Sequence, residues 1–129
     1  MEKRILIIDD DADYSEAIGS VIKSKGYQVD TASDSETGLQ KIQNDKPDLI
    51  ILDVMMKTKD EGFNFARMLK KHGEYKNIPI IMLTAVREST GFDFRSEVGD
   101  DKWLPVDDYC DKFVEKKDLL LKIEKLLQS

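Results

Sequence analysis

Apolar residues along the chain follow two patterns that alternate. Short continuous apolar runs occur at residues 5–8, 49–52 and 78–83, and longer segments with helical spacing lie between them. Continuous runs of this length are typical of buried strands, whereas an apolar residue at every third or fourth position predicts a helix. The alternation predicts a β-α-β-α order and a parallel sheet.

The segment after the first apolar run predicts a helix over residues 12–25. Its apolar residues share one helical stripe and are Tyr14, Ala17, Ile18, Val21 and Ile22. Gly26 follows them, and a left-handed helix end costs little at a glycine. Residues 27–32 alternate between polar and apolar side chains, which predicts a second strand at an edge of the sheet.

Two further helices are predicted around the third strand. Ser33 and Glu36 have the spacing of a capping box at the start of the second helix, and residues 44–48 contain the proline that ends it. A third helix is predicted over residues 62–72. His72, the only histidine, falls in its last turn after two lysines, where positive charge complements the helix dipole. We therefore interpret His72 as structural.

The last part of the chain predicts two strands and two helices. Residues 78–84 form a continuous strand pattern that ends on the hydroxyl of Thr84, and a weak stripe within residues 86–106 predicts a short fourth helix. Residues 108–110 look like part of a fifth strand. A leucine-rich stripe predicts a closing helix through Leu119, Leu120, Ile123, Leu126 and Leu127.

The composition fits one domain with a single core. The chain has 129 residues, of which 40% are hydrophobic and 36% charged. No apolar run approaches the roughly 20 residues that span a membrane, and the N-terminus lacks the apolar stretch of a secretion signal. The net charge of −6 disfavours direct binding to nucleic acid. Cys110 is the only cysteine, so we expect a core residue in a cytoplasmic protein without disulfides.

Polar side chains follow the predicted strands on one side of the sheet. Asp9 and Asp10 follow the first strand, and Asp53 follows the third. Thr84 ends the fourth strand, and Lys112 comes just after the fifth. The carboxyl ends of parallel strands meet at one edge, where sheets of this kind bind ligands. Charged groups gathered there need a partner, so the pattern predicts a site that binds a cation.

With these motifs in this order, the chain resembles the receiver domain of two-component response regulators, from Ile5 to the last helix. The motifs are ILIIDDD with Asp9 and Asp10, LIILDVMM with Asp53, IIMLTA with Thr84 and Ala85, and DYCDK with Tyr109 and Lys112. The resemblance implies a flavodoxin-like α/β fold with a doubly wound, five-stranded parallel sheet in the order 2-1-3-4-5. That order agrees with the pattern of strands and helices read from the residues.

The resemblance also implies a Mg²⁺ ion held by oxygen atoms, which this hard cation prefers. Asp10 and Asp53 would bind the ion directly, Asp9 would bind it largely through water, and the backbone carbonyl of Met55 would complete the set. Asp53 would accept a phosphoryl group from a sensor histidine kinase, a phosphotransfer protein or a small acyl phosphate.

The remaining site residues would surround that phosphoryl group. Lys112 would pair with its oxygens, and the backbone at Ala85 would face it. Thr84 would turn toward the phosphate, and Tyr109 would move into the space that Thr84 leaves, as in a two-state switch. The chain departs from the family at Phe113, where proline is usual. In this interpretation the protein is a signalling switch and not an enzyme in the ordinary sense.

The C-terminal sequence KIEKLLQS carries no linker, so the expectation is a stand-alone receiver whose output passes through another protein. The partner surface is expected on the fourth helix, the fifth strand and the last helix. A monomer fits the sequence. Direct contacts with nucleic acid or a membrane are not expected.

Two other functions compete with the receiver interpretation. Asp9 and Asp11 match the D-x-D start of haloacid-dehalogenase-type phosphatases, in which Asp9 would be the nucleophile and Asp11 the general acid and base. That interpretation leaves Asp53 without a role, and the chain has no room for a cap. The other alternative is an interaction module that keeps the site but works without phosphorylation.

Overall fold

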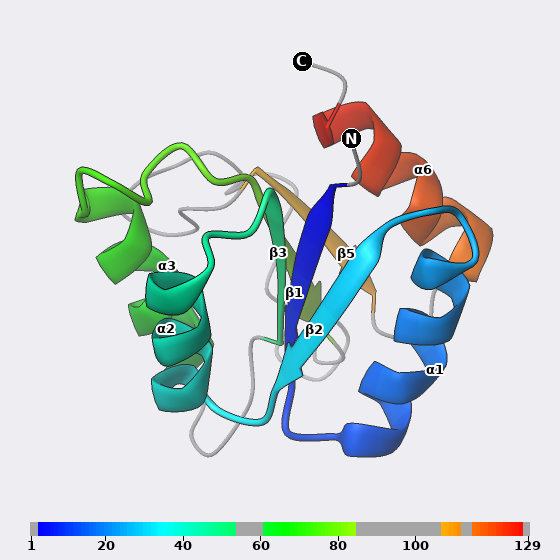
Figure 1. The fold of residues 1–129 in the computed structure, drawn as a ribbon, viewed down its shortest axis with the longest axis horizontal. Coiled ribbons are helices and arrows are strands. Elements are labelled where there is room, and N and C mark those ends of the chain that lie inside the picture. Colours follow the sequence, from blue (N-terminus) through cyan, green and yellow to red (C-terminus); the bar gives the residue numbers. More distant parts are fainter. Residues whose placement is uncertain (1–2, 54–60, 85–106, 112–114, 128–129) are drawn as a thin grey trace, which may run out of the picture.

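The computed structural model describes residues 3–53, 61–84, 107–111 and 115–127. Strands and helices alternate within residues 3–53 and 61–84, and one strand and one helix occupy the last two parts (Figure 1). The elements are β1 (Arg4–Ile8), α1 (Ala12–Lys23), β2 (Gln28–Ala32), α2 (Ser35–Asn44), β3 (Leu49–Asp53), α3 (Glu61–Lys71), β4 (Ile80–Thr84), β5 (Asp108–Asp111) and α6 (Lys116–Leu127).

The five strands form one parallel sheet. Their spatial order is β2-β1-β3-β4-β5, which confirms the doubly wound order that the resemblance implied. β2 lies at an edge, as its polar alternation predicted. β1 and β3 lie inside the sheet, and every side chain at residues 5–8 and 49–52 is buried. The continuous apolar runs are therefore strands that are covered on both faces.

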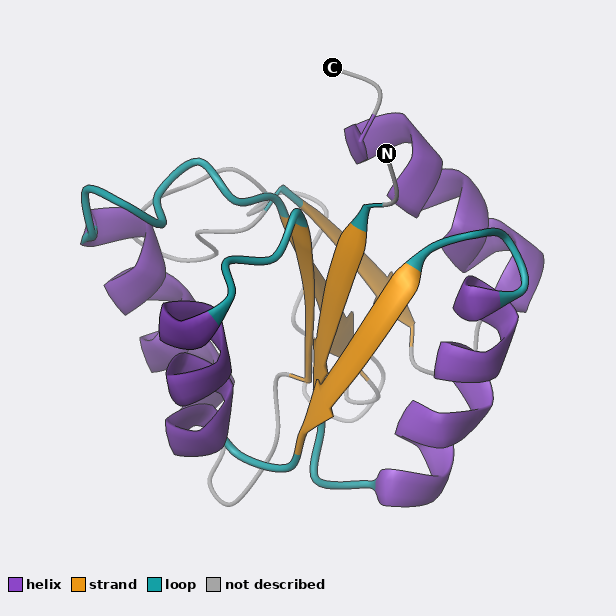
Figure 2. Cartoon of the chain, viewed as in Figure 1, coloured by secondary structure: helices purple, strands orange, loops and turns teal. Residues whose placement is uncertain are grey.

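Helices cover both faces of the sheet. α1 and α6 lie on one face, and α2 and α3 lie on the other (Figure 2). Ile5 and Ile7 pack in the cluster that includes α1 and α6, whereas Leu6 and Ile8 pack in the cluster that includes α2 and α3. Successive side chains of a strand point to opposite faces, so the same short strands anchor both helical layers.

The buried face of α1 differs from the predicted stripe. Ile18 and Ile22 are buried as predicted, but Ser15 and Gly19 are buried with them, whereas Ala17 is exposed. The helix is thus turned so that small residues face the sheet. The apolar stripe alone did not predict this, because a serine and a glycine carry no hydrophobic signal.

Two helix ends also differ from the predictions. α1 ends at Lys23, before Gly26, which has the left-handed conformation with a φ of 95°. The N-cap of α2 is Asp34 and not Ser33. The Asp34 Oδ1 accepts the backbone N–H of Thr37 at 2.7 Å, so the helix starts one residue later than predicted.

His72 lies just beyond α3 and not in its last turn, because the helix ends at Lys71. Its Nδ1 accepts the backbone N–H of Glu74 at 3.2 Å. Its ring stacks on Tyr75 with 4.4 Å between ring centroids. These local contacts agree with a structural role for the histidine.

The C-terminal predictions are confirmed where the structure describes the chain. β5 occupies Asp108–Asp111, and α6 buries Leu119 and Ile123. Cys110 is buried, as predicted. The short helix predicted within residues 86–106 lies outside the described residues. None of the described helices combines the length and apolar character that a membrane-spanning segment requires.

The outer edge of β2 is occupied by side chains of the protein itself. The N–H of Thr31 donates to Asp30 Oδ1 at 2.9 Å, and the C=O of Thr31 accepts the Lys41 ammonium from α2. Lys41 Nζ also lies 2.8 Å from Asp30 Oδ1. Partial burial acts to raise the pKa of Asp30, but the hydrogen bonds from Lys41 and Thr31 and the charges of Lys41 and Arg4 lower it overall.

This ion pair makes a small, pH-dependent contribution to stability. A depressed carboxyl pKa stabilises the fold above the unfolded value of 3.8, and the contribution disappears as the pH falls through the lower folded value. Both side chains are more than a third exposed. We therefore expect Lys41→Gln to lower the free energy of unfolding by less than about 1 kcal/mol at pH 7.

Urea denaturation of Lys41→Gln at pH 7 and at low pH measures this contribution, with Lys25→Gln as a control at an exposed lysine. The difference from the wild type should shrink as the pH falls below 3.8. A difference that stays constant with pH would show that the Asp30 charge is not its source.

Gly38 permits close contact between α2 and β1. A Cβ at this position would lie 2.6 Å from Ile8 Cδ1 and 3.1 Å from Ile8 Cγ1. Ile8 is fully buried, so its side chain has little room to move. The second helix can approach the sheet this closely only because residue 38 has no side chain.

We therefore expect Gly38→Ala to destabilise the protein even though alanine favours helix. Overpacking a core costs about 1–3 kcal/mol, which exceeds the roughly 1 kcal/mol that alanine gains over glycine in a helix. Gly19→Ala in α1 is the matched control, since its Cβ would meet Val29 Cγ1 at 3.4 Å. Urea denaturation should show a loss for the first variant and none for the second. Equal effects would refute close packing at Gly38.

Candidate functional site

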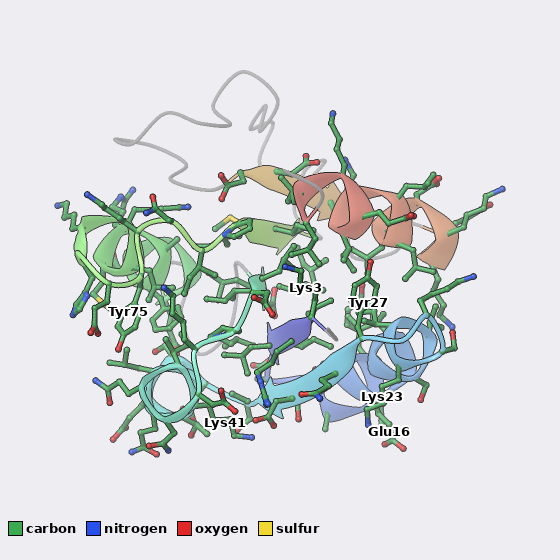
Figure 3. The ribbon with its side chains drawn as sticks, turned by 45° about the horizontal axis from the view of Figure 1, so that its top comes forward. Lys3, Glu16, Lys23, Tyr27, Lys41 and Tyr75 are labelled. Atoms are coloured by element: carbon green, nitrogen blue, oxygen red, sulfur yellow. The ribbon has the colours of Figure 1, made fainter. Side chains whose placement is uncertain are left out.

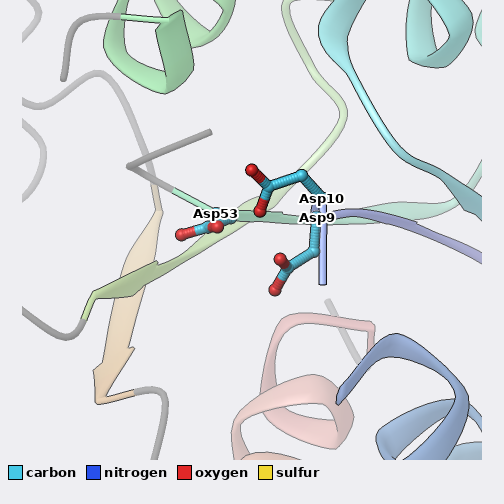
Figure 4. A group of neighbouring side chains, drawn as sticks. All are labelled: Asp9, Asp10 and Asp53. Atoms are coloured by element: carbon cyan, nitrogen blue, oxygen red, sulfur yellow. The ribbon is translucent and has the colours of Figure 1, made fainter. Parts of the chain in front are cut away.

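Three carboxylates meet at the carboxyl edge of the sheet. One oxygen from each of Asp9, Asp10 and Asp53 can be chosen so that all three lie within 4.8 Å of one another. Asp9 and Asp53 are buried, with 2% and 4% of their surface exposed, and Asp10 is exposed. Figure 4 shows Asp9 and Asp10 at the end of β1 beside Asp53 at the end of β3. The carboxylates predicted to meet therefore do so.

Strand register places these side chains together. β1 and β3 are parallel neighbours with Ile8 opposite Leu52, so the residues that follow, Asp9 and Asp53, are also adjacent. The backbone N–H of Asp9 donates to Ala32 O at 3.0 Å, which extends the β1–β2 pairing by one residue. Two buried strands thus hold two acidic side chains at fixed positions.

The turn after β1 is fixed by hydrogen bonds from its own residues. The N–H of Asp11 donates to Asp9 Oδ1 at 2.9 Å. The Asp11 Oδ1 accepts the N–H of Tyr14 at 3.1 Å and so caps α1. The D-x-D pattern suggested only a phosphatase role for Asp11, although an aspartate directly before the first residue of a helix is a cap signal. Its carboxylate is turned toward the helix.

The donor set fits a hard divalent cation. Three carboxylates this close repel one another, and burial of two of them adds a desolvation cost. Mg²⁺ binds through one or more carboxylates and keeps several waters, which the exposed side of Asp10 allows. The residues present can therefore hold such an ion between the ends of β1 and β3.

The other predicted site residues are placed only by their backbone or lie outside the described residues. Thr84 ends β4, which pairs with β3 so that Asp53 lies opposite Leu83. Tyr109 lies in β5 opposite Met82. Both positions belong to strands that end at the same edge as the carboxylates. The predictions for Met55, Ala85 and Lys112 concern positions outside the described residues.

A match to a protein-family model identifies the family of this chain. The family model named response regulator receiver domain matches residues 5–124. The chain belongs to this family. The receiver domain also resembles solved structures over its whole length, including a putative response regulator from Chloroflexus aurantiacus. That structure has a TM-score of 0.84 at 28% identity, and the match covers 100% of both chains.

A second solved structure and two curated relatives agree. The chemotaxis response regulator CheY4 of Vibrio cholerae has a TM-score of 0.81 at 26% identity, with 98% of this chain and 100% of that chain covered. The alkaline phosphatase synthesis transcriptional regulatory protein PhoP of Bacillus subtilis is 34% identical over 128 residues, and the phosphate regulon transcriptional regulatory protein PhoB of Klebsiella pneumoniae is 30% identical over 128 residues. Each match covers 99% of this receiver domain but only 50% and 53% of the relative, respectively. The chain thus spans about half the length of these curated relatives.

Repulsion within the carboxylate cluster predicts an unusual effect of substitution. Asp10→Asn removes one of three like charges without touching the Asp11 helix cap. In chelator-treated protein, we expect this change to raise the free energy of unfolding by up to about 1 kcal/mol, the scale of two charges 4 Å apart in water.

Thermal or urea denaturation with and without excess Mg²⁺ tests this expectation. Added Mg²⁺ should stabilise the wild type more than Asp10→Asn, because the variant has lost one ligand. A variant less stable than the wild type in chelator would contradict repulsion at the site.

Proposed function

We propose that this receiver domain accepts a phosphoryl group on Asp53 from a sensor histidine kinase or a phosphotransfer protein. The observation that carries the proposal is the meeting of Asp9, Asp10 and Asp53 within 4.8 Å at the carboxyl edge of the sheet. Family membership supports it, since receiver domains act in two-component signalling and generally bind Mg²⁺.

In the proposed reaction, a carboxylate oxygen of Asp53 attacks the phosphorus of a phosphohistidine. The P–O bond to Asp53 forms as the P–N bond breaks, and the imidazole of the donor leaves. Asp9 and Asp10 would hold Mg²⁺ together with Asp53 and the carbonyl of Met55. The bound ion supplies positive charge that neutralises the phosphoryl oxygens, which is the main requirement of phosphoryl transfer.

The protein's own groups complete the proposed site. The Lys112 ammonium pairs with a phosphoryl oxygen, and the backbone at Ala85 faces the phosphoryl group. The Thr84 hydroxyl turns toward the new phosphate, and Tyr109 takes up the space behind it. The result is a change of protein surface and not release of a product, as befits a signalling switch.

We further propose that a partner protein reads this change on the surface that includes β5 and α6. β5 pairs with β4, which ends at Thr84, so the strand next to the site is continuous with this surface. In this proposal the receiver domain makes no direct contact with nucleic acid or a membrane.

The phosphatase alternative receives less support. It needs Asp11 as general acid and base, whereas the Asp11 carboxylate accepts a backbone N–H at the start of α1. It also gives no role to Asp53, which is buried beside Asp9. The receiver function uses all three carboxylates.

Intact-mass measurement after incubation with acetyl phosphate and Mg²⁺ tests the proposal directly. We expect one added phosphoryl group on the wild type, and none on Asp53→Asn or in the presence of a chelator. Asp13→Asn changes an exposed carboxylate of α1 outside the cluster and is the matched control, which should label like the wild type.

Three outcomes would contradict the proposal. Label that remains on Asp53→Asn would place the phosphoryl group on another residue. Steady turnover of an aryl phosphate that requires Asp9 and Asp11 but not Asp53 would support the phosphatase alternative. An absence of label from both acetyl phosphate and a phosphorylated donor protein would favour an interaction module that works without phosphate.

A further inference from the structure

The edge strand β5 is short and has one neighbour. It contains four residues, Asp108–Asp111, and pairs only with β4 among the described strands. Its last residue lies opposite Thr84, at the edge of the sheet where Asp9 and Asp53 meet. A strand this short gains few backbone hydrogen bonds from one neighbour, so its place on the sheet depends on other contacts.

A carboxylate directly before β5 fixes the register of the strand. The N–H of Asp107 donates to Ile80 O at 2.9 Å, and Asp107 Oδ2 accepts the N–H of Ile80 at 2.8 Å. Ile80 is the first residue of β4, and both of its backbone groups are thus bound to one residue at the start of β5. A slip of β5 along β4 would break both bonds at once.

The ammonium of Lys70, in the last turn of α3, joins this contact to the helix. Lys70 Nζ lies 2.9 Å from Asp107 Oδ2, 3.1 Å from Ile78 O and 3.4 Å from Lys76 O. These are three acceptors for the three N–H donors of an ammonium. Only 18% of the Lys70 side chain is exposed, so this ion pair is partly shielded from water and salt. Lys70 therefore connects α3, the segment before β4 and the start of β5.

A second ion pair binds the next residue from the other face of the sheet. Lys122 Nζ of α6 lies 3.3 Å from both carboxylate oxygens of Asp108. Successive residues of a strand point to opposite faces, so Asp107 reaches α3 and Asp108 reaches α6. Figure 3 looks toward the amino ends of the strands and shows α3, with Tyr75 just after it, on one side of β5 and α6 on the other. Among the ion pairs that join two described residues, these two have the least exposed side chains.

We propose that Lys70 is a positioning residue of the phosphorylation switch, with Lys122 acting from the other face. By fixing the amino end of β5 on β4, Lys70 sets where Tyr109 lies relative to Thr84 before phosphorylation. The anchors lie at the amino end of β5 and the candidate site at its carboxyl end, so the site end of the strand is the part that responds. This inference rests on the proposed function, in which Tyr109 responds to a phosphoryl group on Asp53, whereas the anchoring of β5 does not.

Amide hydrogen exchange of the unphosphorylated protein tests the anchor. Lys70→Met should make the protected amides of β5 exchange about tenfold faster, which is the effect of losing one hydrogen bond between charged groups. Amides of β1 and β3 should change much less, because the loss is local. Lys71→Met changes the adjacent, exposed lysine and is the matched control. Lys70→Arg keeps the charge and the donors and should restore slow exchange.

The second anchor has its own pair of variants. Lys122→Met should also accelerate exchange in β5, since it removes the partner of Asp108 on the other face. Lys125→Met changes an exposed lysine of the same helix and should have no such effect. Circular dichroism checks that each variant is folded.

Fluorine NMR of protein that contains 3-fluorotyrosine tests the effect on the switch. The chain has four tyrosines, and Tyr109→Phe identifies the signal of Tyr109. Acetyl phosphate with Mg²⁺ should label Lys70→Met as fully as the wild type, because the contacts of Lys70 lie at the amino ends of the strands and Asp53 lies at a carboxyl end. At equal labelling, the shift of the Tyr109 signal on phosphorylation should fall to less than about half of the wild-type shift, and Lys70→Arg should restore it. A residue that served stability alone would leave this shift unchanged.

Three results would overturn the inference. Exchange in β5 that is the same in Lys70→Met as in Lys71→Met would mean that Lys70 does not anchor the strand. Equal acceleration in β1, β3 and β5 would mean that it contributes only to overall stability, and a full Tyr109 shift in labelled Lys70→Met would mean that the switch does not depend on it. A wild type that takes no label would instead contradict the proposed function of Asp53, and the exchange measurements would still decide the anchor.

Discussion

Parallel pairing between β1 and β3 places Ile8 opposite Leu52, and most of the molecule depends on that register. It sets which side chains of β1 face each helical layer, and it brings the residue after each strand to the same edge. A shift by one residue would exchange the two faces of the strand and separate Asp9 from Asp53. Core packing and the candidate site therefore rest on the same backbone hydrogen bonds.

Burial of aliphatic side chains in the core compensates for the unfavourable burial of the acidic site. Burying the carboxylates of Asp9 and Asp53 side by side carries a cost in repulsion and desolvation. The fully buried aliphatic residues of β1 and β3 compensate, because each stabilises the fold by about 1.5–3 kcal/mol relative to an exposed position. A carboxylate cluster held this way is ready for a cation before the cation arrives.

The sequence predicted those structural features that leave a regular pattern of hydrophobic and polar residues. The continuous runs before Asp9 and Asp53 identified the inner strands, and the polar alternation of residues 27–32 placed β2 at an edge. The meeting of Asp9, Asp10 and Asp53 followed from the rule that parallel strands end at one edge. The five-strand order itself came from the family resemblance, and the structure agrees with it.

Two kinds of feature could not be predicted in this way: the burial of small residues, and the choice between two residues that could each cap the same helix. Ser15 and Gly19 face the sheet because α1 lies close to β2, which a hydrophobic stripe cannot show. Asp34 and Ser33 are both good caps, and the choice between them depends on where the chain leaves β2. A cavity of about 460 Å³ between α1 and β2 follows from the first of these features.

The occupied edge of β2 has a consequence for how this protein meets others. Outer strands of open sheets are templates on which a foreign strand can pair, which leads to aggregation or to unintended assembly. At Thr31 both backbone groups are engaged by Asp30 and Lys41, so an incoming strand would have to displace an ion pair to gain a hydrogen bond. Growth of the sheet beyond β2 is therefore opposed by the side chains at that edge.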